Sequence, residues 1–341
     1  MNDSLNAPPV GAVDRGLALQ QLMRPLAEFM TDDAVREITI PRPGDLFALR
    51  HGRWCLHEMP ALSFGYLQAL IEATASYNGV NFLPIMSLVL PGGERFQAMQ
   101  PPAMIDGTLS ISIRKHSTLV KTLDELDAEG AFGSWKELRD PSVLTDEDRV
   151  LLELKEAGRI REFLHQAVQF RRNIIIGGKT GSGKTTFARS LIERVPLDER
   201  VATIEDVHEL WLPNHRNRIH LIYGNGVGQV SAFDCIAACM RSSPDRILLS
   251  ELRGPEAWEY LTALNTGHPG SVTTTHANSA FDVFDRVALL IKQSHAGQQI
   301  DVQTIRQYLY STLDIALYFS RYRLREIYFN PGRTAPQQLA A

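Results

Sequence analysis

The segment from residue 178 to residue 185 constrains the fold of this chain more than any other feature. It reads GKTGSGKT and matches the pattern G-x-x-x-x-G-K-[ST] at every fixed position. An apolar strand is expected before it, at Asn173 to Ile176, and a helix after it, near residues 184–194. Glycines let backbone amides wrap around a polyphosphate, and the positive end of the helix dipole strengthens the attraction. The sequence therefore predicts a phosphate-binding loop.

The predicted loop assigns roles to its side chains. Lys184 should reach the β- and γ-phosphates of a nucleotide such as ATP, and the hydroxyl of Thr185 should coordinate Mg²⁺. A glycine-rich turn that binds nothing is the alternative, and a dinucleotide-binding fold is disfavoured because G-x-G-x-x-G is absent. The residues expected to contact the nucleotide are Gly178, Lys179, Thr180, Gly181, Ser182, Gly183, Lys184, Thr185 and Thr186.

The loop lies within a segment where strands and helices alternate. One amphipathic helix is expected over residues 151–168, and strands are expected at RVATI, RIHLIY, RILLS and SVTTT. This alternation is typical of βαβ units and therefore of an α/β fold with a parallel sheet covered on both faces. The α/β domain is expected to span residues 149–341.

The first part of the chain has a different organisation. Residues 1–16 resemble a flexible arm, and residues 17–115 combine short alternating strands with helices at Leu17 to Met30 and at residues 63–78. This pattern predicts a small α+β N-terminal domain. Residues 116–148 are acidic and poor in periodic apolar positions, which indicates a linker with some helical pieces.

Composition excludes several protein classes. The 341 residues carry a net charge of -4, so the chain is no polycationic nucleic-acid binder. Residues 1–150 are net acidic and residues 151–341 net basic, which favours the second part for a phosphate ligand. The three cysteines are too few for a four-thiolate zinc site, and Cys235 and Cys239 are expected to pack in the core. With no signal peptide or membrane-spanning stretch in the pattern, we expect a cytosolic protein, at most peripheral to a membrane.

Two acidic positions and one histidine follow predicted strands. Glu205 and Asp206 come directly after RVATI, and Glu251 comes directly after RILLS. Because parallel strands end at the same edge of a sheet, these carboxylates are candidates to bind Mg²⁺ or to orient the attacking water. Solvated loop acids are the alternative. His276 ends the strand SVTTT and could sense a γ-phosphate, although a lone histidine is more often structural.

These motifs together resemble those of the secretion ATPase superfamily. The phosphate loop GGKTGSGKT is followed by TIEDVHEL, which resembles the aspartate box of that superfamily. RSSPDRILLSELRG then resembles its atypical Walker B, and GHPGSVTTTHAN its histidine box. The N-terminal segment LPGGERFQAMQPPAMIDGTLSISIRK and the ending DIALYFSRYRLREIYFNP are most similar to the hexameric traffic ATPases of type IV secretion systems, the VirB-eleven family.

The resemblance implies a site between two domains. It implies a RecA-like P-loop NTPase domain with a parallel-rich sheet, and arginines of the N-terminal domain, Arg95 and Arg114, that approach the phosphates. Glu205 and Glu251 are the implied water-orienting and magnesium-linked acids, with Thr185 and Glu251 as metal ligands and His276 as the γ-phosphate sensor. Which acid orients the water stays open. The implied catalytic set is Lys184, Glu205, Glu251, His276, Arg95 and Arg114.

Other details of the resemblance leave alternatives. Arg241 and Arg253 flank the Walker B, where either could simply pair with a carboxylate. Ser250 stands where the family usually has glycine, and its hydroxyl could displace Glu251 or hydrogen-bond to it. The family implies a homohexamer that works with other secretion components at the bacterial inner membrane, on DNA or protein cargo. Another motor of the superfamily and a nucleotide-gated docking platform with little turnover are the competing interpretations.

Overall fold

The computed structural model describes residues 15–116, 120–135 and 143–332, and the chain divides into two compact units. Unit 1 comprises residues 1–101 and 106–117, and unit 2 comprises residues 102–105 and 118–341. Each unit has its own hydrophobic core. The sequence predicts a flexible arm at residues 1–16, of which residues 1–14 lie outside the described part of the chain. The last two residues of the predicted arm belong to a helix, which begins at Arg15.

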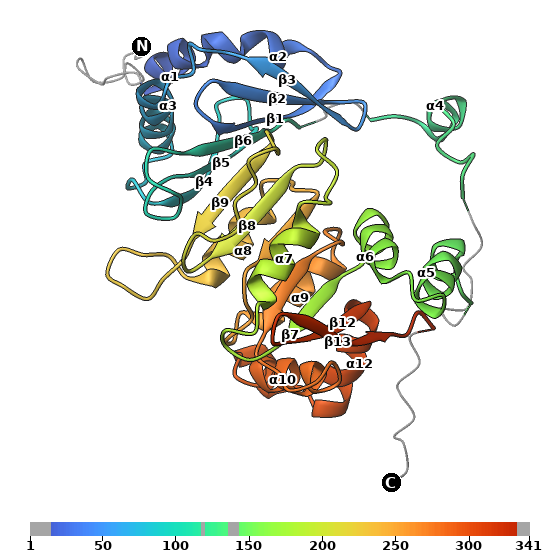
Figure 1. Cartoon of the computed structure of the whole chain (residues 1–341). Coiled ribbons are helices and arrows are strands. Elements are labelled where there is room, and N and C mark those ends of the chain that lie inside the picture. The colour runs from blue at the N-terminus through green and yellow to red at the C-terminus, as the bar shows by residue number, and fades with distance from the viewer. Residues whose placement is uncertain (1–14, 117–119, 136–142, 333–341) are drawn as a thin grey trace, which may run out of the picture. The chain divides into compact units, whose positions relative to one another are not determined.

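Unit 1 is built on a six-stranded sheet in which every neighbouring pair is antiparallel (Figure 1). Its spatial order is β3-β2-β1-β6-β5-β4. Apolar residues alternate along these strands and fill the core on one face. Polar residues on the other face of the central strands, among them Thr39, Gln97 and Ser112, are buried as well. The strands are β1 (Val35–Arg42), β2 (Asp45–Arg50), β3 (Arg53–Glu58), β4 (Ile85–Val89), β5 (Arg95–Met99) and β6 (Ser110–Arg114).

The helices of unit 1 correct one prediction and confirm another. The single helix expected over Leu17 to Met30 is α1 (Arg15–Met23), a 3₁₀ turn (Arg24–Leu26) and α2 (Ala27–Thr31). Pro25 explains the interruption, because proline has no N–H to continue an α-helix. Leu19 and Leu26 are fully buried, so this segment packs on the sheet as expected. The helix predicted at residues 63–78 is confirmed as α3 (Phe64–Tyr77).

In the described part of the acidic segment between the two predicted domains, a short helix, α4 (Leu123–Ala128), forms before α5 begins. Thr122 and Glu125 form a reciprocal capping box at its start, and none of its residues is buried. Residues 117–119 and 136–142 of the predicted linker lie outside the described part of the chain. A second capping box at Thr145 begins α5 (Asp146–Glu156), a few residues before the predicted domain boundary.

The helix expected over residues 151–168 is two helices, so that prediction was wrong. Helix α5 ends near Gly158, whose φ of 69° is left-handed, and α6 (Ile160–Gln169) follows. Apolar residues on both helices, including Leu151 and Phe163, pack into one core. Their periodicity therefore indicated the buried face correctly and missed only the break.

Unit 2 has two sheets instead of the one that the sequence predicted. The first has the order β10-β8-β9 and is wholly parallel. The second has the order β11-β7-β12-β13, in which only β13 runs antiparallel to its neighbour. The strands are β7 (Ile174–Gly177), β8 (Val201–Glu205), β9 (Arg218–Ile222), β10 (Arg246–Leu249), β11 (Val272–Thr275), β12 (Ile315–Ser320) and β13 (Arg323–Phe329).

Hydrogen bonds join the two sheets just beyond the end of β10, where the chain contacts Thr274 of β11. The amide of Leu252 donates to the carbonyl of Thr274 at 2.8 Å, and the Thr274 hydroxyl donates to the carbonyl of Ser250 at 2.9 Å. The parallel strands β7, β8, β10 and β11 therefore end side by side. An α/β architecture is confirmed, and its carboxyl edge collects the segments that follow these strands.

Helices cover the strands of unit 2 in two groups. Helices α6 and α7 pack on each other, whereas α9 contacts α8, α10 and α12. Figure 1 shows α7 in front of the strands and α8 behind them. Cys235 and Cys239 are buried on α8, as predicted. Within the described residues, no helix is long and apolar enough to cross a bilayer. The helices are α7 (Lys184–Ile192), α8 (Ala232–Cys239), α9 (Ala257–Asn265), α10 (Asp282–Ile291), α11 (His295–Gln298) and α12 (Val302–Thr312).

Candidate functional site

The predicted phosphate loop joins β7 to α7, and its glycines lie where other residues would not fit. Gly183 precedes the helix with a left-handed φ of 92°, and a Cβ there would lie 2.7 Å from the ring of Tyr322. A Cβ on Gly178 would lie 2.5 Å from the carbonyl oxygen of Phe319. The loop backbone therefore packs directly against the β12–β13 hairpin, which only glycine permits.

The turn of that hairpin holds the loop in place. The amide of Tyr322 donates to the carbonyl of Ser182 at 2.9 Å, and Arg321 and Tyr322 both have positive φ. Behind the loop, the rings of Phe187 and Phe319 stack with centroids 4.7 Å apart. Sequence reasoning missed this contact, because the turn contains no glycine to mark it.

The loop presents donors without internal acceptors, which suits an anionic ligand. The hydroxyl of Ser182 is buried and has no hydrogen-bond partner among the described residues. No side chain caps the N-terminus of α7, so the positive end of its dipole is uncompensated. Lys184 is buried in the first turn. These features fit the phosphates of a nucleotide.

Glu251 lies at the centre of a cluster of positive groups. Its Oε1 lies 3.6 Å from Lys184 Nζ and 3.1 Å from His276 Nε2. Its Oε2 accepts from Arg253 Nε at 2.7 Å. Arg253 also pairs with Asp206, which follows β8. The structure thus brings together Lys184, Glu251 and His276, three residues that the sequence singled out.

Glu205 has different neighbours from its sequence neighbour Asp206. Consecutive residues at a strand end point to opposite faces, and Asp206 points toward Arg253. Glu205 is fully buried and accepts from the amides of Glu209 and Leu210 at 2.7 and 2.6 Å. Among the described residues, neither Lys184 nor Glu251 forms a hydrogen bond or an ion pair with Glu205. The structure therefore does not place the two predicted acids in one cluster.

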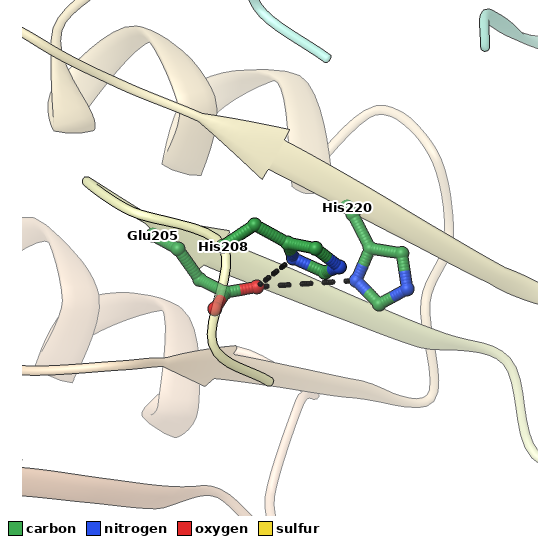
Figure 2. A group of neighbouring side chains, drawn as sticks. All are labelled: Glu205, His208 and His220. Carbon is green, nitrogen blue, oxygen red and sulfur yellow. Dashed lines mark hydrogen bonds and ion pairs between the residues drawn. The ribbon is translucent and has the colours of Figure 1, made fainter. Parts of the chain in front are cut away.

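Two histidines complete the surroundings of Glu205. His208 Nδ1 lies 3.1 Å from Glu205 Oε1, and His220 Nδ1 lies 3.9 Å from the same oxygen (Figure 2). The Thr203 hydroxyl donates to Glu205 at 2.8 Å and also contacts His220 Nδ1. Sequence reasoning missed this cluster, although the spacing of Glu205 and His208 and the alternation along β9 were visible signals.

Arg95 and Arg114 lie in unit 1 on neighbouring strands. They are directly opposite each other in the register of β5 and β6, and both are exposed. Like charges in facing cross-strand positions destabilise a sheet unless an anion compensates them. Glu37 of β1 lies opposite Arg114 on its other side and supplies one such anion within the sheet. Their placement side by side is therefore compatible with the predicted role in phosphate binding.

Comparisons with known proteins agree with these features. The family model described as "Type II/IV secretion system protein" matches residues 144–315. The type IV secretion system protein VirB11 of Brucella suis is 38% identical over 320 residues, covering 91% of this chain and 88% of that protein. PtlH of Bordetella pertussis is 35% identical over 344 residues, covering 95% and 99%.

A solved structure extends this similarity to the fold. The crystal structure of the VirB11 ATPase from the Brucella suis type IV secretion system, in complex with sulphate, superposes with a TM-score of 0.88. Its sequence is 36% identical, and the match covers 94% of this chain and 96% of that one. The chain belongs to the VirB11 family of type IV secretion ATPases.

In this VirB11-family chain, Ser250 leaves the Glu251 cluster intact. The Ser250 hydroxyl is buried and has no hydrogen-bond partner among the described residues, so it makes no bond to the Glu251 carboxylate. The Ser250 amide donates to the carbonyl of Ile204 at 3.0 Å. The sequence did not decide whether Arg253 acts on the ligand or simply pairs with a carboxylate. In the structure it pairs with both Asp206 and Glu251.

Tyr223 lies close to the same acids. Burial raises the pKa of the Tyr223 hydroxyl well above its usual range, and the nearby charges of Asp206 and Glu256 raise it further. The Tyr223 amide donates to the carbonyl of Glu205 at 2.9 Å. The Tyr223 hydroxyl is therefore neutral beside the carboxylates of Asp206 and Glu256. Sequence reasoning did not identify this residue.

Proposed function

We propose that this chain is an ATP-hydrolysing motor that powers a bacterial type IV secretion system, acting as a homohexamer. We further propose that unit 2 is the RecA-like motor domain and that the ring attaches peripherally to the inner membrane through other secretion components. Its cargo would be DNA or protein. The observation that carries the proposal is the convergence of Lys184, Glu251 and His276 beside a phosphate loop.

The Lys184–Glu251 pair places a carboxylate against the lysine of the phosphate loop. A separation of 3.6 Å is an ion pair that a stronger anion can replace. When phosphates enter the loop, Lys184 exchanges the carboxylate for phosphate oxygens. Glu251 keeps its contacts with Arg253 and His276 and would then lie beside the phosphates, with His276 as the proposed γ-phosphate sensor.

Magnesium fits the donors at this edge. Thr185 and Glu251 are the residues that would hold it, and when bound it supplies positive charge against the phosphate oxygens. Because phosphoryl transfer needs mostly positioning and charge stabilisation, the remaining contributions come from Lys184 and the arginines of unit 1, Arg95 and Arg114. Glu205, the other expected acid, would act in this conformation by ordering the loop that carries Asp206.

The test is the substitution Lys184→Ala. We expect phosphate release to fall at least about 100-fold, since a fixed charge at the developing anion is removed. The mass by light scattering should remain that of the wild-type oligomer. Lys155→Ala, at the end of α5, is the control and should hydrolyse ATP normally. Normal turnover in Lys184→Ala would exclude the proposed site.

A second test addresses unit 1. Arg95→Ala and Arg114→Ala should each slow hydrolysis without unfolding the chain, because each removes one positive charge from the exposed pair. If both variants hydrolyse ATP at the wild-type rate, the arginines do not contact the phosphates. A wild-type protein that binds ATP with negligible phosphate release would instead favour a docking platform.

A further inference from the structure

The Glu205 cluster combines three potential metal ligands on one face of a parallel sheet. Thr203 and Glu205 alternate along β8, so they point to the same face, and His220 lies opposite Thr203 in the register of β9. His208 returns over this face from the loop that follows β8, as Figure 2 shows. One ligand atom from each of Glu205, His208 and His220 lies within 4.8 Å of the other two.

We propose that Glu205, His208 and His220 form a binding site for Zn²⁺. Three ligands at about 2.1 Å from a tetrahedral zinc lie roughly 3.4 Å from one another. The distances from Glu205 Oε1 to the Nδ1 atoms of His208 and His220, 3.1 and 3.9 Å, bracket that value. Small side-chain rotations therefore suffice, and a water molecule can take the fourth position.

The donor set selects the metal. Two imidazoles and one carboxylate suit zinc, whereas Mg²⁺ prefers oxygen ligands and keeps several waters. This site is thus chemically distinct from the magnesium site proposed at Thr185 and Glu251. It also needs no thiolate, so the small number of cysteines does not bear on it.

Neighbouring groups already hold the Glu205 carboxylate in a fixed orientation by hydrogen bonds. The amides of Glu209 and Leu210 bind Oε2, and the Thr203 hydroxyl binds Oε1 at 2.8 Å. Such contacts fix the orientation of a metal ligand. The Nε2 atom of His208 is buried with no hydrogen-bond partner among the described residues, so it can carry the ring proton when Nδ1 binds the metal without breaking another hydrogen bond.

Hydrogen bonds that the two imidazoles already make compete with the metal. The Thr203 hydroxyl contacts His220 Nδ1 at 2.8 Å, and His208 Nδ1 contacts Glu205 Oε1 at 3.1 Å. Arg218 Nε donates to His220 Nε2 at 3.2 Å, which places the ring proton on Nδ1 in the metal-free protein. Zinc must displace that proton from Nδ1, and the proton then occupies Nε2, so Arg218 has to turn away. Arg218→Gln should therefore bind zinc more tightly than the wild type.

Trp211 provides a direct readout. Its indole is 59% exposed and packs edge-on against the His208 ring with centroids 4.1 Å apart. A metal on His208 should change Trp211 fluorescence. Because Glu205 and Asp206 are consecutive, the same ion would also restrain the Asp206–Arg253 pair beside Glu251.

The experiment titrates ZnCl₂ into the full-length protein without nucleotide, with fluorescence and isothermal titration calorimetry as readouts. We expect one zinc per chain in the wild type. His208→Gln and His220→Gln should each weaken binding by at least about 10-fold, the loss that even outer-shell changes cause. His215→Gln, a buried histidine of the same segment that is not in the cluster, is the matched control and should bind like the wild type.

Zinc should also raise the unfolding temperature of the wild type and of His215→Gln, but not of the two ligand variants. Trp211→Phe should lose the fluorescence change and keep the calorimetric one. Equal zinc affinity in the wild type, His208→Gln and His220→Gln would overturn the proposal, as would the absence of binding to the wild type. Since no nucleotide is present, these results do not depend on whether the chain hydrolyses ATP.

Discussion

Glu205 is the last residue of β8 and Glu251 follows the neighbouring parallel strand β10, yet their surroundings differ in kind. Glu251 contacts three side chains that carry or can acquire positive charge: Lys184, Arg253 and His276. Glu205 is held by two backbone amides, a hydroxyl and an imidazole. Charged side chains can exchange partners when a ligand arrives, whereas backbone amides cannot move away. Glu251 is therefore suited to a changing role, and Glu205 to a fixed one.

The largest expected effect comes from Glu251→Gln. The amide keeps the size of the side chain and removes its charge, so the variant should fold normally and lose the ion pair with Lys184. We expect phosphate release to fall about 100-fold or more. Steady-state phosphate assays and a thermal unfolding curve measure the two properties. If Glu251→Gln were unstable but hydrolysed ATP normally, Glu251 would have the fixed, structural role that we assign to Glu205.

The substitution Glu205→Gln should show the opposite pattern. A glutamine amide group has only one acceptor oxygen, so a bond to the backbone amides or to Thr203 is lost inside a buried site. The expected cost is about 1–3 kcal/mol of unfolding free energy. Denaturant unfolding measures it, with Glu209→Gln, on the same loop, as the control. Wild-type stability in Glu205→Gln would show that the fixed contacts contribute little.

A smaller effect on stability should follow from lowering the pH, through His215 in the segment between β8 and β9. His215 is 2% exposed, and burial lowers its pKa below the usual value. The unfolded chain binds the proton with a pKa of about 6.5, so stability is complete above that pH and declines as the pH falls below it. The unfolding temperature should drop between about pH 7.5 and about pH 5.5, and His215→Gln should drop less. An equal drop of the unfolding temperature in the wild type and in His215→Gln would show that His215 does not cause the pH dependence.

The smallest effect is expected from Ser250→Ala, next to Glu251. The buried hydroxyl has no partner among the described residues, so its removal should change stability by less than about 1 kcal/mol. Turnover should stay within about 2-fold of the wild type, because the Ser250 backbone contact to Ile204 is retained. A large loss of turnover would mean that the hydroxyl positions Glu251 after all.

The sequence predicted the parts of the site that depend on local pattern. Motif spacing located the phosphate loop, and the rule that parallel strands end at one edge placed Glu251 and His276 near Lys184. It could not predict which of two consecutive acids points toward that cluster. That choice depends on the pleat of β8 and on where the strand ends, which shifts by a residue without any change in pattern.

Long-range pairing accounts for the other differences. The β12–β13 hairpin contacts the phosphate loop through Ser182 and Tyr322, which lie far apart in the chain. The division of unit 2 into two sheets also arises from hydrogen-bond geometry between β10 and β11, which periodicity does not encode. In contrast, Pro25 and Gly158 are visible in the sequence, and the helix breaks there could have been predicted from their backbone chemistry.

The position of β7 has a consequence for the order in which the molecule can form during synthesis. Its two neighbours in the sheet, β11 and β12, both lie much later in the chain. The strand that leads into the phosphate loop therefore leaves the ribosome without either of its partners. The contact between Ser182 and Tyr322 can form only after residue 322 has emerged, so the phosphate loop is synthesised long before the hairpin that supports it.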